Sequence, residues 1–287
     1  MIERVDRLTP AQCAAVRRLL AEEEERSGRR PLDEVNRLAL AGTDPAPREH
    51  WLMTDPQLLA YAVVSPAGVA ELTACDVAAA TTLLAEVRNR HPAGILWTHG
   101  DRSTGNRAAR GLGLTCAREL LLLARALPLD HPERPLPDGV TRSAFRREVD
   151  AEDWLELNAR AFADLPDQAS WDAGDLALRL SAPWFDTNDF HIARGSDGSM
   201  AGFHWTKIDP DASADGTVSG EVFVIAVDPR WRGTGLGAAL LDHGLHHLAE
   251  RGMPQAHLFV DADNRAAVGL YEAAGFRRVD GDRQYLL

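Results

Sequence analysis

The clearest pattern of hydrophobic and polar positions lies in the last quarter of the chain. An apolar run at residues 222–227 is followed by an Arg- and Gly-rich turn at residues 232–237. Helical spacing of apolar residues then covers 235–251, a second apolar run covers 256–260, and another helical pattern covers 264–274. Short apolar runs predict buried strands, and helical spacing predicts a helix with one buried face. This region is therefore predicted to fold as strand, turn, helix, strand and helix.

The same patterns extend over the whole chain and form two similar series of elements. Helices are predicted at residues 10–27, 77–88, 103–112, 152–162, 173–180, 235–251 and 264–274. Strands are predicted at residues 51–53, 58–64, 69–72, 94–98, 119–125, 140–145, 190–193, 200–207, 221–227, 256–260 and 276–287. In each series the strands first follow one another and then alternate with helices, which is typical of a mixed sheet. The expected fold class is α/β (mixed α+β).

A proline-rich segment divides the chain near its middle. Residues 127–139 contain four prolines, which cannot all belong to a helix or to a central strand. We therefore expect a first domain at residues 1–127, a linker at residues 128–139 and a second domain at residues 140–287. A duplicated domain and two unrelated α/β modules both agree with this division.

The turn at residues 232–237 has the features of a phosphate-binding site. A strand that leads into a glycine turn at a helix start directs free N–H groups and the helix dipole at one point, which attracts an anion. No Lys follows the glycines, so a Walker loop is excluded. A dinucleotide fingerprint fits formally from Gly233 through Gly235 to Ala238, but it predicts further βα repeats. A glycine-rich connection without a ligand is the third alternative.

Composition and charge limit the function classes. The chain has 287 residues, 45% of them hydrophobic, which suits two domains with their own cores. The net charge of −12 argues against nucleic acid or an anionic membrane as a partner and agrees with a small cationic substrate such as an amine. No apolar run could span a membrane and no signal peptide begins the sequence, so we expect a cytoplasmic protein. We also expect a monomer.

Cysteines and histidines give no metal-binding pattern. The chain has three cysteines, an odd number without a CxxC motif, which suggests free thiols in a reducing compartment. His243 and His247 lie four residues apart on one predicted helix, but no third ligand has the spacing of a metal site. We therefore expect no metal.

Two motifs together resemble the Gcn5-related N-acetyltransferase (GNAT) superfamily. The first is Arg-x-x-Gly-x-Gly at residues 232–237, and the second is Asn-x-x-Ala-x-x-x-Tyr-x-x-x-Gly-Phe at residues 264–276. The resemblance implies acetyl-CoA as the cosubstrate, with its pyrophosphate on the first motif. It implies that the preceding strand splays from the next one to admit the pantetheine arm, and that Tyr271 protonates the leaving thiolate. The coenzyme-binding residues implied in this way are Ile225, Ala226, Val227, Arg232, Gly233, Thr234, Gly235, Leu236, Gly237, Ala238, Asn264, Arg265, Ala266, Ala267, Val268 and Gly269.

The first half resembles the second without its ligand-binding residues. Aligning the last helices of the two halves at Gly113 and Gly275 places Ala109 at the position of Tyr271. Residues 73–80, which correspond to the glycine turn, contain neither Gly nor Arg. The resemblance thus implies two tandem GNAT-like domains, each with a mixed, mostly antiparallel sheet flanked by helices, of which the N-terminal one is degenerate and non-catalytic.

A narrower resemblance is to the mycothiol synthases, a family of tandem GNAT enzymes. The matching segments are residues 158–162, 182–186, 202–207 and 220–224, with 31–34 as the main match in the first half. The family transfers acetyl from acetyl-CoA to the cysteinyl amine of cysteinyl-glucosaminyl-inositol, the last step of mycothiol biosynthesis. The alternatives are a GNAT enzyme for another amine, such as an amino sugar, an aminoglycoside or a peptide N-terminus, and a non-catalytic acyl-CoA-binding protein.

This chemistry requires few groups. An amine must lose its proton before it attacks a thioester, and Glu221 at the start of the splayed strand is the expected base. Backbone N–H groups around residues 225–227 are expected to stabilise the charge that develops on the thioester oxygen. By resemblance, the substrate-binding positions are Glu34, Asp167, Lys207, Glu221 and Phe259.

Two of these positions depart from the family pattern. Residues 165–168 read Leu-Pro-Asp-Gln where the family usually has His-Pro-Glu-Gln, and Phe259 replaces an aromatic residue with a hydroxyl. Phe neither donates nor accepts a hydrogen bond, so one contact to the acceptor is expected to be missing. Both departures concern the acceptor and leave the coenzyme site intact.

Overall fold

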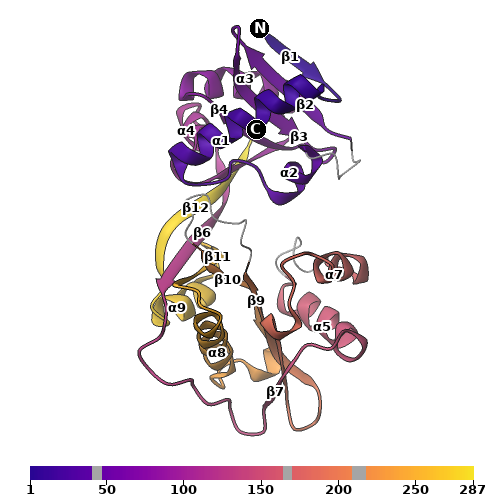
Figure 1. Ribbon diagram of the computed structural model, residues 1–287, viewed down its shortest axis with the longest axis vertical. Coiled ribbons are helices and arrows are strands. Elements are labelled where there is room, and N and C mark those ends of the chain that lie inside the picture. Colours follow the sequence, from indigo (N-terminus) through magenta and orange to yellow (C-terminus); the bar gives the residue numbers. More distant parts are fainter. Residues whose placement is uncertain (41–46, 164–169, 209–217) are drawn as a thin grey trace.

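The computed structural model describes residues 1–40, 47–163, 170–208 and 218–287, without the side chains of residues 34 and 38. Two lobes are joined by long strands (Figure 1). The upper lobe contains β1 (Ile2–Val5), α1 (Pro10–Ser27), α2 (Glu34–Leu40), β2 (Glu49–Thr54), β3 (Leu58–Val64), β4 (Val69–Ala74), α3 (Val77–Arg90), β5 (Ile95–His99) and α4 (Thr104–Gly111). The lower lobe contains β7 (Thr141–Ala144), α5 (Arg147–Ala161), α7 (Ala173–Leu180), β8 (Phe190–Arg194), β9 (Met200–Ile208), β10 (Gly220–Val227), α8 (Leu236–Glu250), β11 (Gln255–Asp261) and α9 (Arg265–Ala273).

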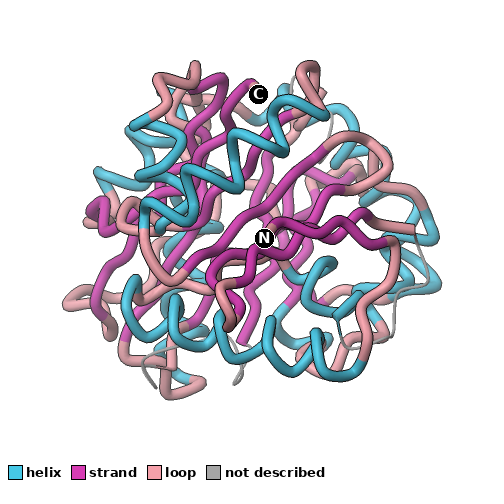
Figure 2. The backbone as a smooth tube through the Cα atoms, turned by 90° about the horizontal axis from the view of Figure 1, so that it is seen from above, coloured by secondary structure: helices cyan, strands magenta, loops and turns pink. Residues whose placement is uncertain are grey.

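A single sheet of 12 strands runs through both lobes in the described chain, in the order β1-β2-β3-β4-β5-β12-β6-β11-β10-β9-β8-β7. The sheet twists strongly, and helices lie around it (Figure 2). Among the described strands, only the β4–β5 and β10–β11 pairs are parallel. The expected mixed, mostly antiparallel architecture with flanking helices is confirmed.

The strands β6 (Cys116–Ala126) and β12 (Arg277–Leu286) exchange places between the halves. β12, the last strand of the chain, pairs with β5 of the first half, and β6 of the first half pairs with β11 of the second. The side chains follow their strands: Tyr285 and Leu287 pack in the first-half core, whereas Leu123 and Leu127 pack in the second-half core. A domain boundary placed in the linker therefore assigns β6 to the first half and β12 to the second, although each strand packs in the core of the other half.

Most predicted elements have a counterpart in the structure. The predicted helix at 10–27 and strand at 58–64 agree with α1 and β3 in both bounds. The patterns missed β1, which has only four residues and none buried, and α2, which has seven. In the described part of the chain, no helix combines the length and the apolar character needed to cross a membrane.

Candidate active site

A gap opens in the sheet between β10 and β11. Their parallel pairing is limited to Gly220 with Ala256 and Glu221 with His257, although β10 continues beside β9 as far as Val227. A bulge between Val222 and Val224 interrupts the β9 register at the same point, as bulges do where a strand bends away from its neighbour. Within the described residues, the β11-facing edge of β10 beyond Glu221 therefore has no strand partner. The predicted splay is present.

The glycine turn lies where β10 leads into α8. Gly233 and Gly235 have φ angles of +78° and +90°, a region that residues with a Cβ rarely adopt. Gly235 precedes the first residue of α8, and no side chain caps the helix there. A Cβ added to either glycine would meet no protein atom within 4 Å, so the space in front of the turn is open. The Leu236 N–H makes a long hydrogen bond of 3.4 Å to the Thr234 hydroxyl, and the N–H groups that follow it in the first helical turn can receive an anion.

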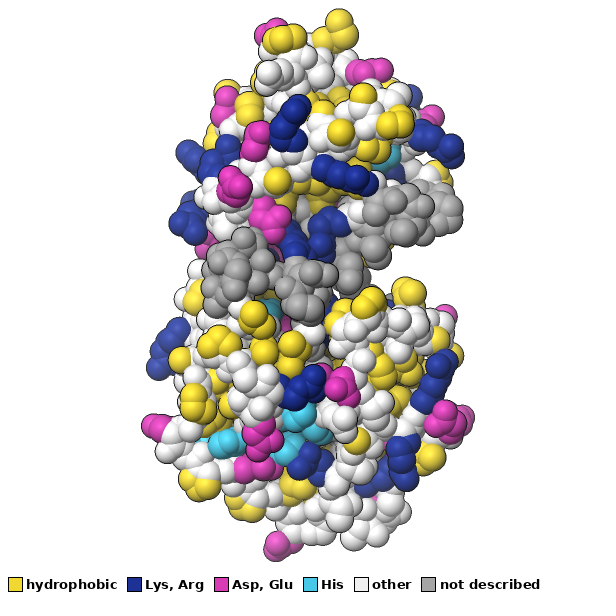
Figure 3. Space-filling view, viewed as in Figure 1, with side chains coloured by type: hydrophobic (Ala, Val, Ile, Leu, Met, Phe, Trp, Pro, Cys, Tyr) yellow, Lys and Arg dark blue, Asp and Glu magenta, His cyan; other side chains and the backbone are white. Residues whose placement is uncertain are grey.

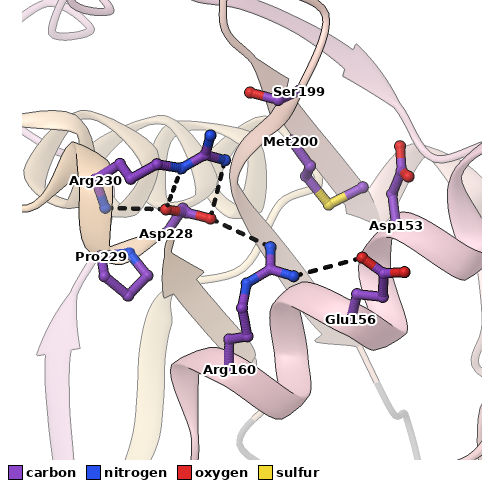
Figure 4. Close-up of a pocket in the computed structure, with 8 residues that line it drawn as sticks. All are labelled: Asp153, Glu156, Arg160, Ser199, Met200, Asp228, Pro229 and Arg230. Carbon is purple, nitrogen blue, oxygen red and sulfur yellow. Dashed lines mark hydrogen bonds and ion pairs between the residues drawn. The ribbon is translucent and has the colours of Figure 1, made fainter.

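A buried carboxylate fixes the chain just before this turn. Asp228 accepts hydrogen bonds from the Arg230 backbone N–H at 2.9 Å and the Arg160 guanidinium at 3.2 Å (Figure 4). The hydrogen bond from the Arg230 side chain, together with these contacts, lowers the pKa of Asp228 to about 2. The group borders a cavity of about 470 Å³ that α5 lines on one side with Asp153, Glu156 and Arg160. Sequence reasoning missed this anchor, although an Asp-Pro pair before a glycine turn is a recognisable signal.

The second motif forms the start of α9. The Asn264 side chain accepts a hydrogen bond from the Ala267 N–H at 3.1 Å and so caps the helix. The residues implied for the coenzyme extend from this cap to Gly269. Asn264, Arg265, Ala266 and Gly269 are exposed, and Ala267 and Val268 are half-buried.

Tyr271 lies on the buried side of α9. Its ring packs in the same apolar cluster as Val222 and Leu258, which stand where β10 and β11 begin to separate. Burial raises the pKa of Tyr271 to about 12, so the hydroxyl keeps its proton at neutral pH. A protonated phenol beside the gap agrees with the predicted role as an acid.

Glu221 lies between two basic side chains across the sheet. Its register partners are Lys207 on β9 and His257 on β11, and directly opposite residues project from the same face of a sheet. The Lys207 ammonium lies 4.7 Å from the centre of the Trp184 ring and 5.5 Å from that of Phe223. Burial lowers the pKa of His257 and Glu221 partly offsets this, so the imidazole is neutral at pH 7.

Arg29 reaches this face from the other lobe. Its guanidinium carbon lies 5.1 Å from the centre of the Phe259 ring, and its Nη2 contacts Asp282 at 2.9 Å. A cationic hydrogen-bond donor therefore lies over the Phe259 ring. This is the position at which the sequence predicted a missing hydrogen bond to the acceptor. Sequence reasoning missed both Arg29 and His257, because their importance depends on partners far away in the chain.

A buried polar network holds Arg29 in place. His99 bridges Asp282 through Nδ1 at 3.1 Å and Glu71 through Nε2 at 2.8 Å. Burial alone would lower the pKa of His99, but the hydrogen bonds and charges of these two carboxylates outweigh it and raise the pKa to about 10. The protonated imidazole thus pairs with both carboxylates, and the Arg29 guanidinium adds a second positive charge at Asp282. Burial would raise the pKa of Asp282, but His99 and Arg29 lower it.

Two predicted acceptor residues have no described side chain. Glu34 is the first residue of α2, but its side chain is outside the described part, and Asp167 is outside the described residues altogether. The Asp33 backbone N–H, next to Glu34, donates to the Glu71 carboxylate at 3.1 Å. The start of α2 is therefore fixed by the same network as Arg29.

The corresponding gap in the first half is filled by protein. Parallel pairing of β4 with β5 ends at Glu71 and Trp97, as it ends at Glu221 and His257 in the second half. Beyond that point, the Ala74 N–H donates to the Thr104 hydroxyl at 3.2 Å. At the start of α3 the Asp76 carboxylate caps the helix, whereas α8 starts at an uncapped glycine. A carboxylate at this position both occupies a donor and repels a phosphate.

Comparison with known proteins identifies the family. Residues 151–276 match the acetyltransferase (GNAT) family. A mycothiol acetyltransferase of Thermobispora bispora is 42% identical over 97% of this chain and 97% of its own. Another, from Streptomyces griseus, is 38% identical over 99% of this chain and 94% of its own.

Solved structures agree in fold. A GCN5-related N-acetyltransferase from Sphaerobacter thermophilus has a TM-score of 0.71 at 20% identity, covering 99% of this chain and 94% of that one. A tandem GNAT protein from the clavulanic acid biosynthesis pathway has a TM-score of 0.68 at 15% identity, covering 99% and 98%. The expected fold and the expected resemblance are both confirmed, and the chain belongs to the mycothiol acetyltransferases of the GNAT superfamily.

Proposed function

We propose that the second half transfers acetyl from acetyl-CoA to the cysteinyl amine of cysteinyl-glucosaminyl-inositol, and that the first half supplies part of the acceptor site without catalysing. The observation that carries the proposal is the contrast between the two strand gaps. In the second half the edge of β10 beyond Glu221 has no strand partner among the described residues and leads to a glycine turn with open space before it, whereas Thr104 and Asp76 occupy the corresponding positions of the first half.

The residues present fit acetyl-CoA. Donors at the start of α8 and the unpaired edge of β10 suit a pyrophosphate followed by an amide-containing arm. The bound cosubstrate supplies the activated acetyl group. Arg232 is exposed beside the turn, where its charge suits the phosphates.

Each catalytic role belongs to a group of this chain. Glu221 accepts the proton of the acceptor ammonium, directly or through a water. N–H groups of β10 beyond the bulge, around residues 225–227, stabilise the negative charge that develops on the acetyl oxygen. Tyr271, which holds its proton up to about pH 12, donates it to the departing thiolate.

The acceptor is proposed to lie between the lobes. Lys207 and Glu221 hold its amine end, and Arg29, stacked on Phe259, donates hydrogen bonds to its sugar or inositol hydroxyls. Glu34 and Asp167 complete this site in the proposal. Since one chain supplies both lobes, a monomer is sufficient. The free thiols of Cys13, Cys75 and Cys116 support a reducing, cytoplasmic setting.

The test is an acceptor panel with acetyl-CoA, in which release of coenzyme A is measured. Cysteinyl-glucosaminyl-inositol, a cysteine amide without the sugars, and glucosamine are compared by kcat/KM. The proposal expects the full conjugate to be the best acceptor by a wide margin. Equal use of the truncated amide would show that the contacts to the sugars are not used, and would favour a general amine acetyltransferase.

A further inference from the structure

Two histidines and an aspartate converge where the linker crosses α8. His131 belongs to the proline-rich segment, and Asp242 and His246 stand one turn apart on α8. His131 Nε2 lies 3.6 Å from Asp242 Oδ1, and His246 Nε2 lies 3.7 Å from Asp242 Oδ2. One ligand atom from each of the three residues can be chosen so that all lie within 4.8 Å of one another. Histidine side chains are also seen gathered in the lower lobe in Figure 3.

These separations fit shared ligands better than hydrogen bonds. Nitrogen–oxygen hydrogen bonds in proteins measure about 2.7–3.2 Å, so both contacts are too long. Two ligands on a tetrahedral zinc ion, with metal–ligand bonds of about 2.0–2.1 Å, lie about 3.3 Å apart. His131 lies nearest Oδ1 and His246 nearest Oδ2 of Asp242, and the ligand atoms of the three residues lie within 4.8 Å of one another, so the side chains must move closer together to bind one ion.

Hydrogen bonds from neighbouring groups orient His131 and Asp242, as is usual for metal ligands. His131 Nδ1 lies 3.1 Å from the Pro132 carbonyl, and a proton on Nδ1 leaves the Nε2 lone pair facing Asp242. The Arg134 backbone N–H donates to Asp242 Oδ2 at 2.8 Å and orients the carboxylate. His246 Nε2 is buried and has no hydrogen-bond partner among the described residues. A buried nitrogen without a partner is costly unless something binds it.

We propose that His131, Asp242 and His246 bind one divalent transition-metal ion, with Zn²⁺ as the best match. Two imidazoles and one carboxylate are common zinc ligands, and solvent would take the fourth position. The ion fastens the linker to α8, the helix whose start forms the anion site. The neighbouring His243 is not one of the three residues whose ligand atoms converge, and its Nδ1 contacts Glu133, which adds a second attachment of the linker.

The opposing explanation is an ion-pair cluster without a metal, in which the two histidines and the Arg134 guanidinium, whose Nε lies 3.6 Å from Asp242 Oδ1, surround the carboxylate. The two explanations differ in their response to an added metal ion, because only a metal site binds one ion per chain and is stabilised by it.

The experiment uses the full chain without a histidine tag, stripped with a chelator and then dialysed. Titration with Zn²⁺ should show one site per chain, and Zn²⁺ should raise the Tm. Co²⁺ should give the visible absorption of a four-coordinate site, and Zn²⁺ should displace it. Absence of a stoichiometric site for either ion would overturn the proposal.

Three variants and one control locate the site. His131→Asn, His246→Gln and Asp242→Asn should each weaken Zn²⁺ binding by at least about tenfold, since even indirect support of a metal ligand contributes that much. Asp242→Asn keeps an oxygen for the Arg134 N–H, so its folding is protected. The control is His91→Asn, because His91 pairs with Glu49 at 3.0 Å and belongs to no candidate metal-ligand group among the described residues. The Tm of each variant in chelator checks folding, and equal Zn²⁺ affinity in the parent and His131→Asn would show that the ion binds elsewhere.

Discussion

Arg29 and Phe259 meet across the two lobes, with the guanidinium carbon 5.1 Å from the ring centre. The contact places a fixed charge from the first half close enough to His257 of the second half to help lower its pKa, although burial is the larger cause. Asp282 orients the guanidinium from the other side, at 2.9 Å. The face of the second-half sheet that we propose for the acceptor therefore contains residues of both halves.

Removing this charge should affect the acceptor and not the coenzyme. Arg29→Met keeps an unbranched side chain of similar reach while the donors and the charge are lost, so the KM for cysteinyl-glucosaminyl-inositol should rise about tenfold or more, as for a lost charged hydrogen bond. The KM for acetyl-CoA and the rate with a truncated cysteine amide should change little. Arg30→Met is the matched control, since Arg30 pairs with Glu24 at 3.1 Å and takes no part in this face. An equal loss with both acceptors would contradict a contact to the sugars.

Adding a side chain at the glycine turn should exclude the coenzyme. Gly235→Val places a branched side chain in the open space before α8 and should weaken acetyl-CoA binding at least about tenfold. The left-handed conformation adds a stability loss of roughly 1–2 kcal/mol. Gly252→Val controls for that loss, because Gly252 has φ +82° and an equally open Cβ position beyond the other end of α8. Calorimetric titration separates the two variants, and equal affinities would contradict the phosphate site.

Glu221→Gln should slow turnover without releasing acetyl-CoA. A positioned general base contributes about 10²–10⁴ in rate, and the amide cannot accept the proton. The deficit should shrink above about pH 8, where the acceptor amine loses its proton to solvent. Glu272→Gln on the exposed side of α9 serves as the control. An unchanged rate at neutral pH would remove Glu221 from the mechanism.

Tyr271→Phe should lower turnover to a similar extent with every acceptor, because the thiolate is the same in each reaction. Acetyl-CoA affinity should stay close to that of the parent. The variant should also be less sensitive to alkali. Burial raises the folded-state pKa to about 12, above the ordinary value of 10.0, so this group's stabilisation is complete below pH 10 and is lost as pH rises towards 12. Kinetics with two acceptors and denaturation at several pH values check both parts.

His99 should make stability depend on pH in the neutral to alkaline range. Its folded-state pKa of about 10 exceeds the ordinary value of 6.5, so the folded chain holds a proton that the unfolded chain releases. Its contribution is complete below pH 6.5 and is lost as pH rises to about 10, with a slope of at most about 1.4 kcal/mol per pH unit. Urea denaturation of the parent and of His99→Gln measures the difference. The variant should be less stable at pH 6.5 and should show a flatter profile, and parallel profiles would contradict the assignment.

Local features of the sequence were enough for most of the elements and for the glycine turn. The apolar run of β10 and the glycines after it specify their structure through short-range rules, namely strand periodicity and permissive φ angles. The acceptor face could not be predicted in the same way. Arg29 follows Gly28 in an ordinary helix end, and only Asp282 and Phe259 give it a position.

Local sequence patterns also could not predict the order of the strands in the sheet. β6 and β12 were both expected as strands, but nothing in their composition says that each pairs with the other half. Register between distant strands depends on which faces are buried after the chain has collapsed. The metal-ligand cluster is a similar case, since His131 lies in a linker and meets Asp242 and His246 only through the path of that linker.

The exchanged strands imply that the peptide linker is not what keeps the halves together. A chain cut within residues 128–139 would still hold β6 between β11 and β12, and β12 between β5 and β6. Two separately produced fragments should therefore assemble into one active particle, as in split-enzyme complementation. The same pairing between two intact chains would give a domain-swapped dimer. Such a dimer should form when the protein is refolded at high concentration.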